Sequence, residues 1–125
     1  MSRFLFVALG AALGANARYI IGLWAAGRLG VSFPYGTFIV NVLGSLLLGF
    51  VVTLASERVT LSPQTRLLIT VGFLGSFTTF SSFAVESVAL MRDGGLWNAL
   101  LNIFGNNLLA LIAVLFGVYI GRIVG

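Results

Sequence analysis

Twelve residues near the middle of the chain, Gly72 to Phe83, combine residue types that seldom occur together in an apolar segment. They include two glycines, five Ser or Thr hydroxyls and four phenylalanines. Because glycine is a poor helix former and clustered hydroxyls offer the backbone competing hydrogen bonds, a helix is expected to loosen here. In a membrane, freed carbonyl groups can hold a cation, and nearby donors can hold an anion. The stretch therefore predicts an ion site at mid-membrane.

Asparagine side chains supply further donors. Asn98, Asn102 and Asn106 recur every four residues, so they share one helical face. A single asparagine can serve as a contact between helices, but three in register favour a polar path. Asn41 has two amide donors, and its residue type is equally consistent with an interhelical hydrogen bond and with a donor facing a conduit.

Charged and aromatic residues near these amides each allow two interpretations. Arg18 is either an interfacial anchor or a positive charge at a water-filled mouth. Phe77, Phe80 and Phe83 recur every three residues and form either a lipid-facing stripe or a set of positive ring edges that favour a small anion. Glu86 either couples transport to protons or pairs with an arginine or the headgroup region.

The composition identifies the class of protein that must position these groups. Of 125 residues, 59% are hydrophobic and 8% are charged, which predicts an integral membrane protein. The net charge of +4 comes from scattered arginines without a basic stripe, so nucleic-acid binding is not expected. The chain has no Cys, no His and three acidic residues. Enzyme chemistry and metal ligation by side chains are therefore not expected.

Hydrophobic runs divide the chain into four segments, each long enough to cross a bilayer. The expected segments are Phe4 to Gly27, Tyr35 to Ala55, Thr65 to Met91 and Leu96 to Arg122. Ser62 and Pro63 are typical of a helix start, with Ser62 as the N-cap. A cleaved signal peptide is the less favoured interpretation of the first run, which is long for one. We expect an all-α integral membrane protein whose residues 1–125 form a single transmembrane domain with a break in the third helix.

Arginine positions bear on orientation, since positive loops favour the cytoplasm. The side carrying both termini and the second loop holds four arginines (Arg3, Arg58, Arg66 and Arg122). The opposite side holds Arg28 and Arg92, or three if Arg18 is counted. This weak bias permits insertion in both orientations. Glycine pairs with four-residue spacing, Gly10 with Gly14 and Gly117 with Gly121, indicate close helix contacts, which we expect between the subunits of a homodimer.

Together these features resemble the small four-span fluoride channels, the Fluc or CrcB family. The resemblance covers the whole chain: its length, its span count, Arg18 in the first span, and Gly36, Thr37 and Asn41 opening the second. The most specific motif is Gly75-Ser76-Phe77-Thr78-Thr79-Phe80-Ser81-Ser82-Phe83.

The resemblance implies a fluoride-selective channel that passes fluoride passively, with two pores in an antiparallel, dual-topology homodimer of the cell inner membrane. It also implies a structural sodium ion at the dimer centre, bound by the backbone carbonyls of Gly75 and Thr78. The residues matching the family's fluoride path are Phe80, Phe83, Asn41, Ser81, Asn106 and the vestibule residue Arg18. Asn102, on the same polar face as Asn106, is added to this path.

The chain departs from the family pattern beyond Asn106. Where relatives are expected to carry hydroxyls one and two turns later, this chain has Ala110 and Val114. Two other functions remain open. One is a small dual-topology, proton-coupled exporter of cationic drugs. Proteins of that class are expected to carry a carboxylate in the first span, and this chain has no carboxylate there. A non-catalytic assembly subunit would explain the glycine pairs but not the polar path.

Overall fold

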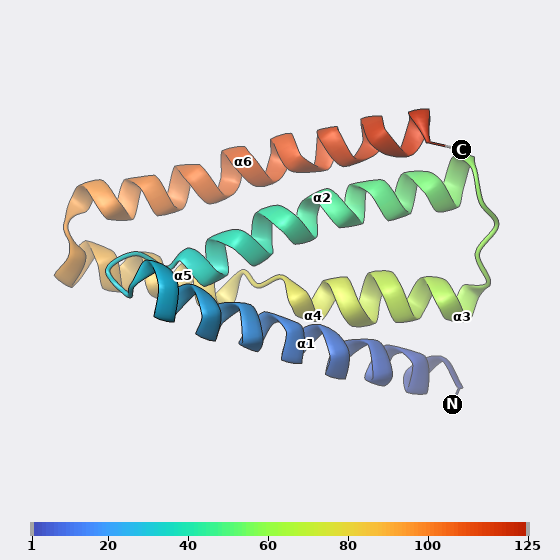
Figure 1. The fold of residues 1–125 in the computed structure, drawn as a ribbon, viewed down its shortest axis with the longest axis horizontal. Helices are drawn as coiled ribbons and strands as arrows, with labels where there is room; N and C mark the ends of the chain where they lie inside the picture. Colours follow the sequence, from blue (N-terminus) through green and yellow to red (C-terminus); the bar gives the residue numbers. More distant parts are fainter. Residues whose placement is uncertain (1, 125) are drawn as a thin grey trace.

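The computed structural model, which describes residues 2–124, consists of helical segments running back and forth beside one another (Figure 1). Helix α1 spans Ser2–Leu29, α2 spans Tyr35–Glu57 and α6 spans Leu96–Ile123. Between α2 and α6 lies a discontinuous segment, Pro63–Gly94. The described chain thus has four segments long and apolar enough to cross a membrane, which confirms the prediction of a four-span membrane protein.

The third segment is divided into short helices. It contains α3 (Pro63–Arg66), the π-helix η1 (Leu67–Leu74), α4 (Gly75–Phe77), α5 (Ser81–Ala89) and the π-helix η2 (Leu90–Gly94). Residues 78–80, which we call the break, separate α4 from α5. The predicted break is confirmed, and it falls at the hydroxyl residues after Gly75 because Thr78 is extended (φ −91°, ψ 161°).

Helix boundaries follow local sequence. The Ser62 side chain accepts a hydrogen bond from the Thr65 N–H, and Pro63 occupies the first turn, as predicted. The chain reverses at Gly30 and Gly95, whose φ values of +89° suit glycine. The expected turn at residues 92–95 is therefore confined to Gly95, because the helical segment continues through Gly94.

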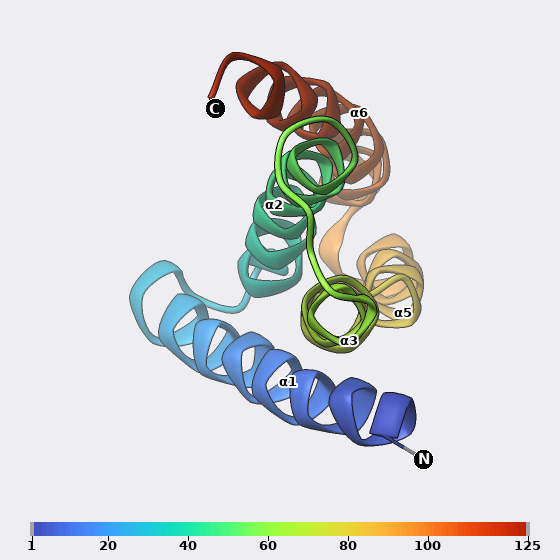
Figure 2. The same ribbon diagram turned by 90° about the vertical axis from the view of Figure 1, so that its right-hand side faces the viewer.

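Helix α2 lies between α6 and the third segment, and α1 packs against η1 and α4 (Figure 2). The views in Figures 1 and 2 place α1 and α6 on opposite sides of the molecule. Both ends of the described chain lie at the same end of the molecule as the α2–α3 connection (Figure 1). The break and the middle of α2 and α6 therefore share the centre of the structure.

The glycine pairs mediate contacts inside the chain, which corrects the expectation that they join subunits. Gly10 and Gly14 face the backbone of η1, around Phe73. Gly117 and Gly121 face the backbone of α2, around Phe50. At each of these glycines a Cβ atom would overlap or crowd the opposing helix, so these helices approach closely because the side chains are absent.

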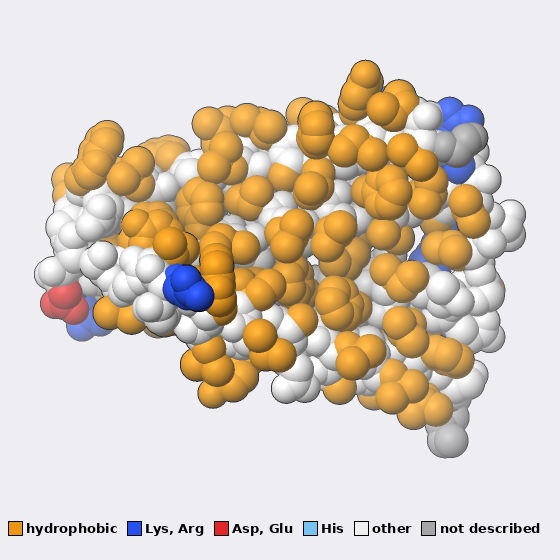
Figure 3. All heavy atoms as spheres, in the orientation of Figure 1, with side chains coloured by type: hydrophobic (Ala, Val, Ile, Leu, Met, Phe, Trp, Pro, Cys, Tyr) orange, Lys and Arg blue, Asp and Glu red, His pale blue; other side chains and the backbone are white. Residues whose placement is uncertain are grey.

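The outer surface of the chain is largely apolar (Figure 3). Large hydrophobic side chains are exposed along both outer helices, including Leu13 and Ile20 on α1 and Leu108 and Leu115 on α6. Few apolar side chains are buried within the chain. Because a lipid bilayer is the environment that such a surface requires, this distribution agrees with membrane insertion.

The glycine contacts give a test of the packing. Gly14→Ala places a methyl group against the Phe73 carbonyl oxygen, so we expect a loss of about 1–3 kcal/mol of stability from overpacking. Gly27→Ala is the matched control, because a Cβ there has no neighbour within 4 Å and alanine favours the helix. Thermal unfolding of both purified variants in detergent measures the difference. Equal midpoints for the two variants would contradict the packing.

Candidate functional site

Asn41 joins α2 to the break through two hydrogen bonds with Thr79. The Thr79 N–H donates to Asn41 Oδ1 at 2.9 Å, and Asn41 Nδ2 donates to the Thr79 carbonyl oxygen at 3.0 Å. Helix geometry supplies no partner for either backbone group, because residue 79 lies between α4 and α5. One side-chain amide therefore satisfies both backbone groups of Thr79, the middle residue of the break.

Other groups satisfy some of the remaining carbonyls around the break. The Leu74 carbonyl accepts from the N–H and the hydroxyl of Thr78, at 3.2 and 3.0 Å. Arg18 Nε, from α1, donates to the Ser76 carbonyl at 3.1 Å. Within residues 2–124, no hydrogen bond ends on the carbonyl oxygens of Gly75 or Thr78. These two carbonyls are therefore available to an external partner.

A series of side-chain hydrogen bonds, the amide relay (Asn41, Asn106, Asn102 and Ser87), continues from the break into α6 and α5. Asn41 Nδ2 donates to Asn106 Oδ1 at 3.0 Å. Asn106 Nδ2 donates to Asn102, at 2.8 Å to Oδ1 and 3.0 Å to the carbonyl oxygen. Asn102 Nδ2 donates to Ser87 Oγ at 2.9 Å. The relay thus connects three spans.

Backbone chemistry at the first end of the relay sets the direction of its bonds. The Thr79 N–H can only donate, so Asn41 must turn its oxygen towards it. The Asn41 nitrogen then faces Asn106, which must present its own oxygen. Asn106 consequently has only its nitrogen to offer to Asn102.

The second end of the relay imposes the same direction. The Ser87 hydroxyl donates to the Phe83 carbonyl at 2.7 Å, so its oxygen is left to accept. Asn102 must therefore present its nitrogen to Ser87 and its oxygen to Asn106. Two backbone groups, one at each end, thus specify a single orientation for every amide between them.

The amide nitrogens of Asn41 and Asn106 share a pattern of partners. Each donates to one backbone carbonyl, that of Thr79 or Asn102 respectively. Each also donates to one side-chain oxygen, Asn106 Oδ1 or Asn102 Oδ1. The backbone bond can hold the amide in place while a small anion replaces the side-chain oxygen. The arrangement therefore offers oriented donors to an anion.

A cavity of about 410 Å³, the break cavity, lies beside these donors. Residues from α2, the break, α5 and α6 line it, among them Asn41, Thr79, Phe83, Asn106 and Ala110. The lining also contains Gly75, Thr78 and Phe80. Most of the residues predicted for an ion site are thus brought together, and the apolar Ala110 forms part of the wall.

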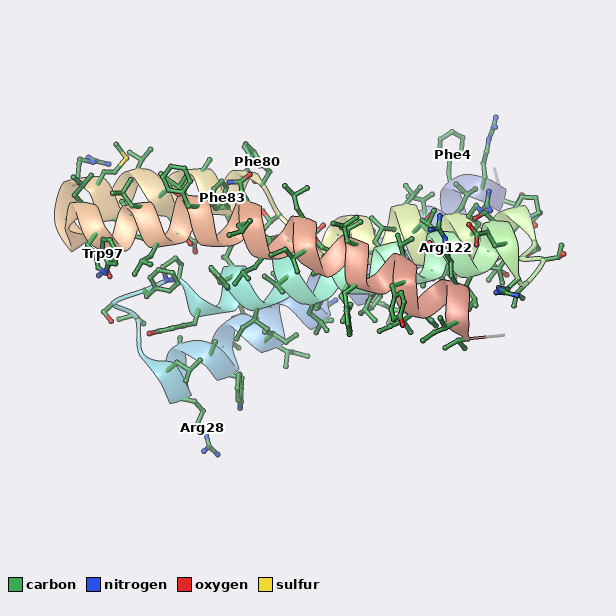
Figure 4. The ribbon with its side chains drawn as sticks, turned by 90° about the horizontal axis from the view of Figure 1, so that it is seen from above. Phe4, Arg28, Phe80, Phe83, Trp97 and Arg122 are labelled. Carbon is green, nitrogen blue, oxygen red and sulfur yellow. The ribbon has the colours of Figure 1, made fainter. Side chains whose placement is uncertain are left out.

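Phe80 and Phe83 lie together at the rim of the break cavity (Figure 4). Their ring centroids are 5.5 Å apart, with the planes tilted by 55°. Phe80 precedes α5 and is 76% exposed, whereas Phe83 is 8% exposed. Phe77, the third member of the predicted stripe, is buried and stacks on Phe73 instead. The phenylalanines therefore do not form one lipid-facing stripe.

Four of the predicted polar-site residues lie apart from the lining of the break cavity. Arg18 contacts the backbone before the break, and Asn102 is fully buried behind Asn106. Ser81 is exposed at the start of α5. The Asn98 amide donates to the Gly94 carbonyl and does not join the relay, so the predicted polar face begins at Asn102.

A second cavity, the loop cavity of about 490 Å³, lies where the α1–α2 connection meets α5 and η2. Its lining includes Thr37, Glu86 and Asp93. The Oε1 atom of Glu86 is buried and has no hydrogen-bond partner within the described residues. The carboxylate singled out in the sequence thus faces a cavity separate in its lining from the break cavity.

Sequence reasoning did not identify Thr79 or Ser87 as site residues. The Thr79 contribution comes from its backbone, which no residue type reveals. Ser87 offered a signal in hindsight, since it is a polar residue four positions after Phe83 on an amphipathic face. Its hydroxyl is buried against α6, where only the three-dimensional packing supplies the Asn102 partner.

The chain resembles known proteins over nearly its full length. Residues 5–118 match the family model described as CrcB-like protein, Camphor Resistance (CrcB). A protein of Chloroflexus aurantiacus is 52% identical over 98% of this chain and 97% of its own length. Proteins of Roseiflexus sp. (48% identical, 94% of both chains) and Trichormus variabilis (47% identical, 95% of this chain and 88% of its own) are also similar.

All three relatives carry the name fluoride-specific ion channel FluC. None of these names describes an enzyme, which supports the prediction that this chain is not one. The family match and the similarity to these relatives extend over all four spans, including the broken third span and the asparagines beside it. The chain therefore belongs to the CrcB-like family of membrane proteins.

Proposed function

We propose that this protein is a fluoride-specific channel that lets fluoride cross the cell inner membrane passively. The observation that carries the proposal is the amide relay, in which the oriented amides of Asn41 and Asn106 line a cavity at the break of the third span. The names of the relatives support the same function. The proposed fluoride path comprises Asn41, Asn106, Phe80 and Phe83, with the other predicted residues placed around it.

Fluoride is small and strongly hydrated, so a path must replace the hydrogen bonds of the water that it sheds. Asn41 and Asn106 can each redirect one N–H from a side-chain oxygen to the ion, because a second bond to backbone holds the amide. The ring edges of Phe80 and Phe83 carry partial positive charge and supply further contacts. The ion is thus stabilised by dipoles, without a titratable group in the break cavity.

The same geometry favours fluoride over chloride. Asn41 Nδ2 and Asn106 Nδ2 are set 3.0 and 2.8 Å from oxygen acceptors. Fluoride is similar in size to these oxygens, whereas chloride is larger and requires the amides to separate. Because each amide also donates to a backbone carbonyl, moving the two amides apart would break hydrogen bonds that stabilise the break.

Around Arg18, Asn102 and Ser81 the structure suggests supporting roles. Arg18 places a positive charge near α4, where it attracts anions towards the break. Asn102 carries the side-chain oxygen Oδ1, which loses its hydrogen bond from Asn106 Nδ2 when that N–H donates to the ion instead. Ser81, exposed beside Phe80, has a hydroxyl that can accompany the ion at the rim.

The proposed functional unit is an antiparallel, dual-topology homodimer with a structural sodium ion. Gly75 and Phe80 are exposed on the isolated chain although both line the break cavity, which favours a second copy covering this face. The residues fit a hard cation, because the carbonyl oxygens of Gly75 and Thr78 accept no hydrogen bond from residues 2–124. Sodium would supply a positive charge that holds two such breaks together.

The first prediction from the proposed function concerns transport. Liposomes containing purified protein are expected to release fluoride rapidly without a proton gradient, and to retain chloride. The physical reason is the set of size-matched, non-titratable donors around the break cavity. Ion-selective electrodes measure both effluxes, with protein-free liposomes as the control. Release of fluoride that requires a proton gradient would favour the proton-coupled exporter, and equal chloride release would refute selectivity.

The second prediction concerns the two rings. Phe80→Ile and Phe83→Ile should each reduce fluoride efflux by about tenfold or more, since isoleucine lacks a positive ring edge and each 1.4 kcal/mol of barrier costs about tenfold in rate. Phe83→Ile should also lower thermal stability, because the Phe83 ring is buried within the chain.

Phe104→Ile is the matched control for these variants, because Phe104 is 65% exposed on α6 and lines neither cavity. It should transport fluoride at the parental rate. Size-exclusion profiles of all three variants establish that the protein is assembled. Parental efflux from Phe80→Ile or Phe83→Ile would remove that ring from the fluoride path.

The third prediction concerns topology. The two membrane faces differ little in their number of arginines. One face has four (Arg3, Arg58, Arg66 and Arg122) and the other has Arg28 and Arg92, a difference too small to fix the orientation of the chain. Reporter tags on the C-terminus should therefore be found on both sides of the membrane. Adding two or three lysines to the α2–α3 connection should move the tags to one side and reduce fluoride efflux. Tags of the parent protein on one side only would contradict dual topology.

A further inference from the structure

We propose that Ser87, acting through Asn102, is a positioning residue that fixes the direction of the amide relay and so keeps the donors of Asn41 and Asn106 turned correctly for the anion. This inference rests on the proposed function for its effect on transport. Its structural part, the orientation of the amides, stands on the hydrogen bonds alone.

Ser87 is placed where its hydroxyl can direct a neighbouring amide. It is 5% exposed, and Asn102 is fully buried beside it. Serine hydroxyls in helices commonly donate to the carbonyl four residues earlier, which Ser87 does towards Phe83. Ser87 differs from this common case because its oxygen also accepts from Asn102 Nδ2. A back-bonded hydroxyl has no proton left for Asn102, so it accepts only the nitrogen end of that amide.

Without that acceptor, the Asn102 amide can turn over. Its nitrogen would then face Asn106 Nδ2, which is itself a donor, and the two N–H groups would conflict. Asn106 cannot resolve the conflict by turning, because its nitrogen would then meet the Asn41 nitrogen, which Thr79 holds in place. One hydroxyl on α5 therefore gives the Asn102 nitrogen an acceptor in the orientation that the Thr79 end of the relay requires. Without it, Asn102 must either leave that buried nitrogen unpaired or turn into the conflict with Asn106.

The relay also links both edges of the break cavity. It begins at Thr79 and ends at the Phe83 carbonyl, and both of these residues line the cavity. Phe83 supplies a ring to the cavity and a carbonyl to Ser87. The position of the ring and the direction of the amides are thus set by one connected series of hydrogen bonds.

Three variants of Ser87 test the proposal. Ser87→Ala removes the acceptor and should lower fluoride efflux by about tenfold, the effect of losing one buried hydrogen bond. Ser87→Thr retains the hydroxyl and should transport fluoride faster than Ser87→Ala, since the acceptor is kept and the added methyl group affects only the packing and the rotamer at this buried site. Ser87→Cys is close in size and a weaker acceptor, so it should give an intermediate rate and serves if Ser87→Ala fails to assemble.

Thr70→Val provides the matched control in the same span. The Thr70 hydroxyl also donates to the carbonyl four residues earlier at 2.7 Å, as Ser87 does, but among the described residues no side chain donates to it. Valine keeps its shape, so efflux should stay at the parental rate. A loss equal to that of Ser87→Ala would show that any removed hydroxyl in this span has the effect, and would overturn the proposal.

A second measurement reports orientation independently of transport. Solid-state NMR of protein labelled with ¹⁵N-asparagine, in liposomes, follows hydrogen–deuterium exchange of the Asn106 side-chain amide. Protection should fall in Ser87→Ala and persist in Ser87→Thr and Thr70→Val. Unchanged protection in Ser87→Ala would overturn the positioning role even if efflux fell. If the parent protein passed no fluoride, the proposed function would fail, and the exchange measurement would still decide the role of Ser87.

Discussion

The pairing of the Asn41 amide with the backbone of Thr79 is the interaction on which the structure depends. An opened helix within a bilayer exposes backbone groups that no water can satisfy, and each unsatisfied group costs several kcal/mol. One asparagine on α2 satisfies both groups of the break's central residue. This pairing also ties α2 to the third span. The close contacts of α1 with the third span at Gly14, and of α6 with α2 at Gly117, pack the helices on either side of it.

The pairing has a consequence for electrostatics. It orients Asn41, which orients Asn106 and Asn102, so the donors of the proposed fluoride path are set by backbone groups that cannot rearrange without breaking the fold. Preorganised dipoles stabilise an ion without reorganisation when it arrives. The fold and the proposed function thus draw on the same hydrogen bonds, so a chain with a small internal core can carry a specific polar site.

Much of this architecture is readable in the sequence. Four apolar runs and the Ser62-Pro63 start specify the spans, and Gly75 with the following hydroxyls specifies a break. Spacing alone could not show that Asn98 bonds to its own helix while Asn102 faces Ser87, because helical periodicity gives a face but not the partner opposite. Spacing also could not distinguish the buried position of Phe77 from the exposed position of Phe80. The two differ because the helix is interrupted between them, where Thr78 is extended. The glycine pairs indicated close contacts correctly, but not that their partners lie within the same chain.

In the proposed path, the amide nitrogens of Asn41 and Asn106 contact the transported ion. Solid-state NMR of ¹⁵N-asparagine protein in liposomes containing fluoride tests this directly through ¹⁹F–¹⁵N dipolar couplings. We predict couplings of bound fluoride to the Nδ2 atoms of Asn41 and Asn106, and none to Asn98, whose amide bonds to its own helix outside the relay. Bound fluoride that couples to neither Asn41 nor Asn106 would contradict the account.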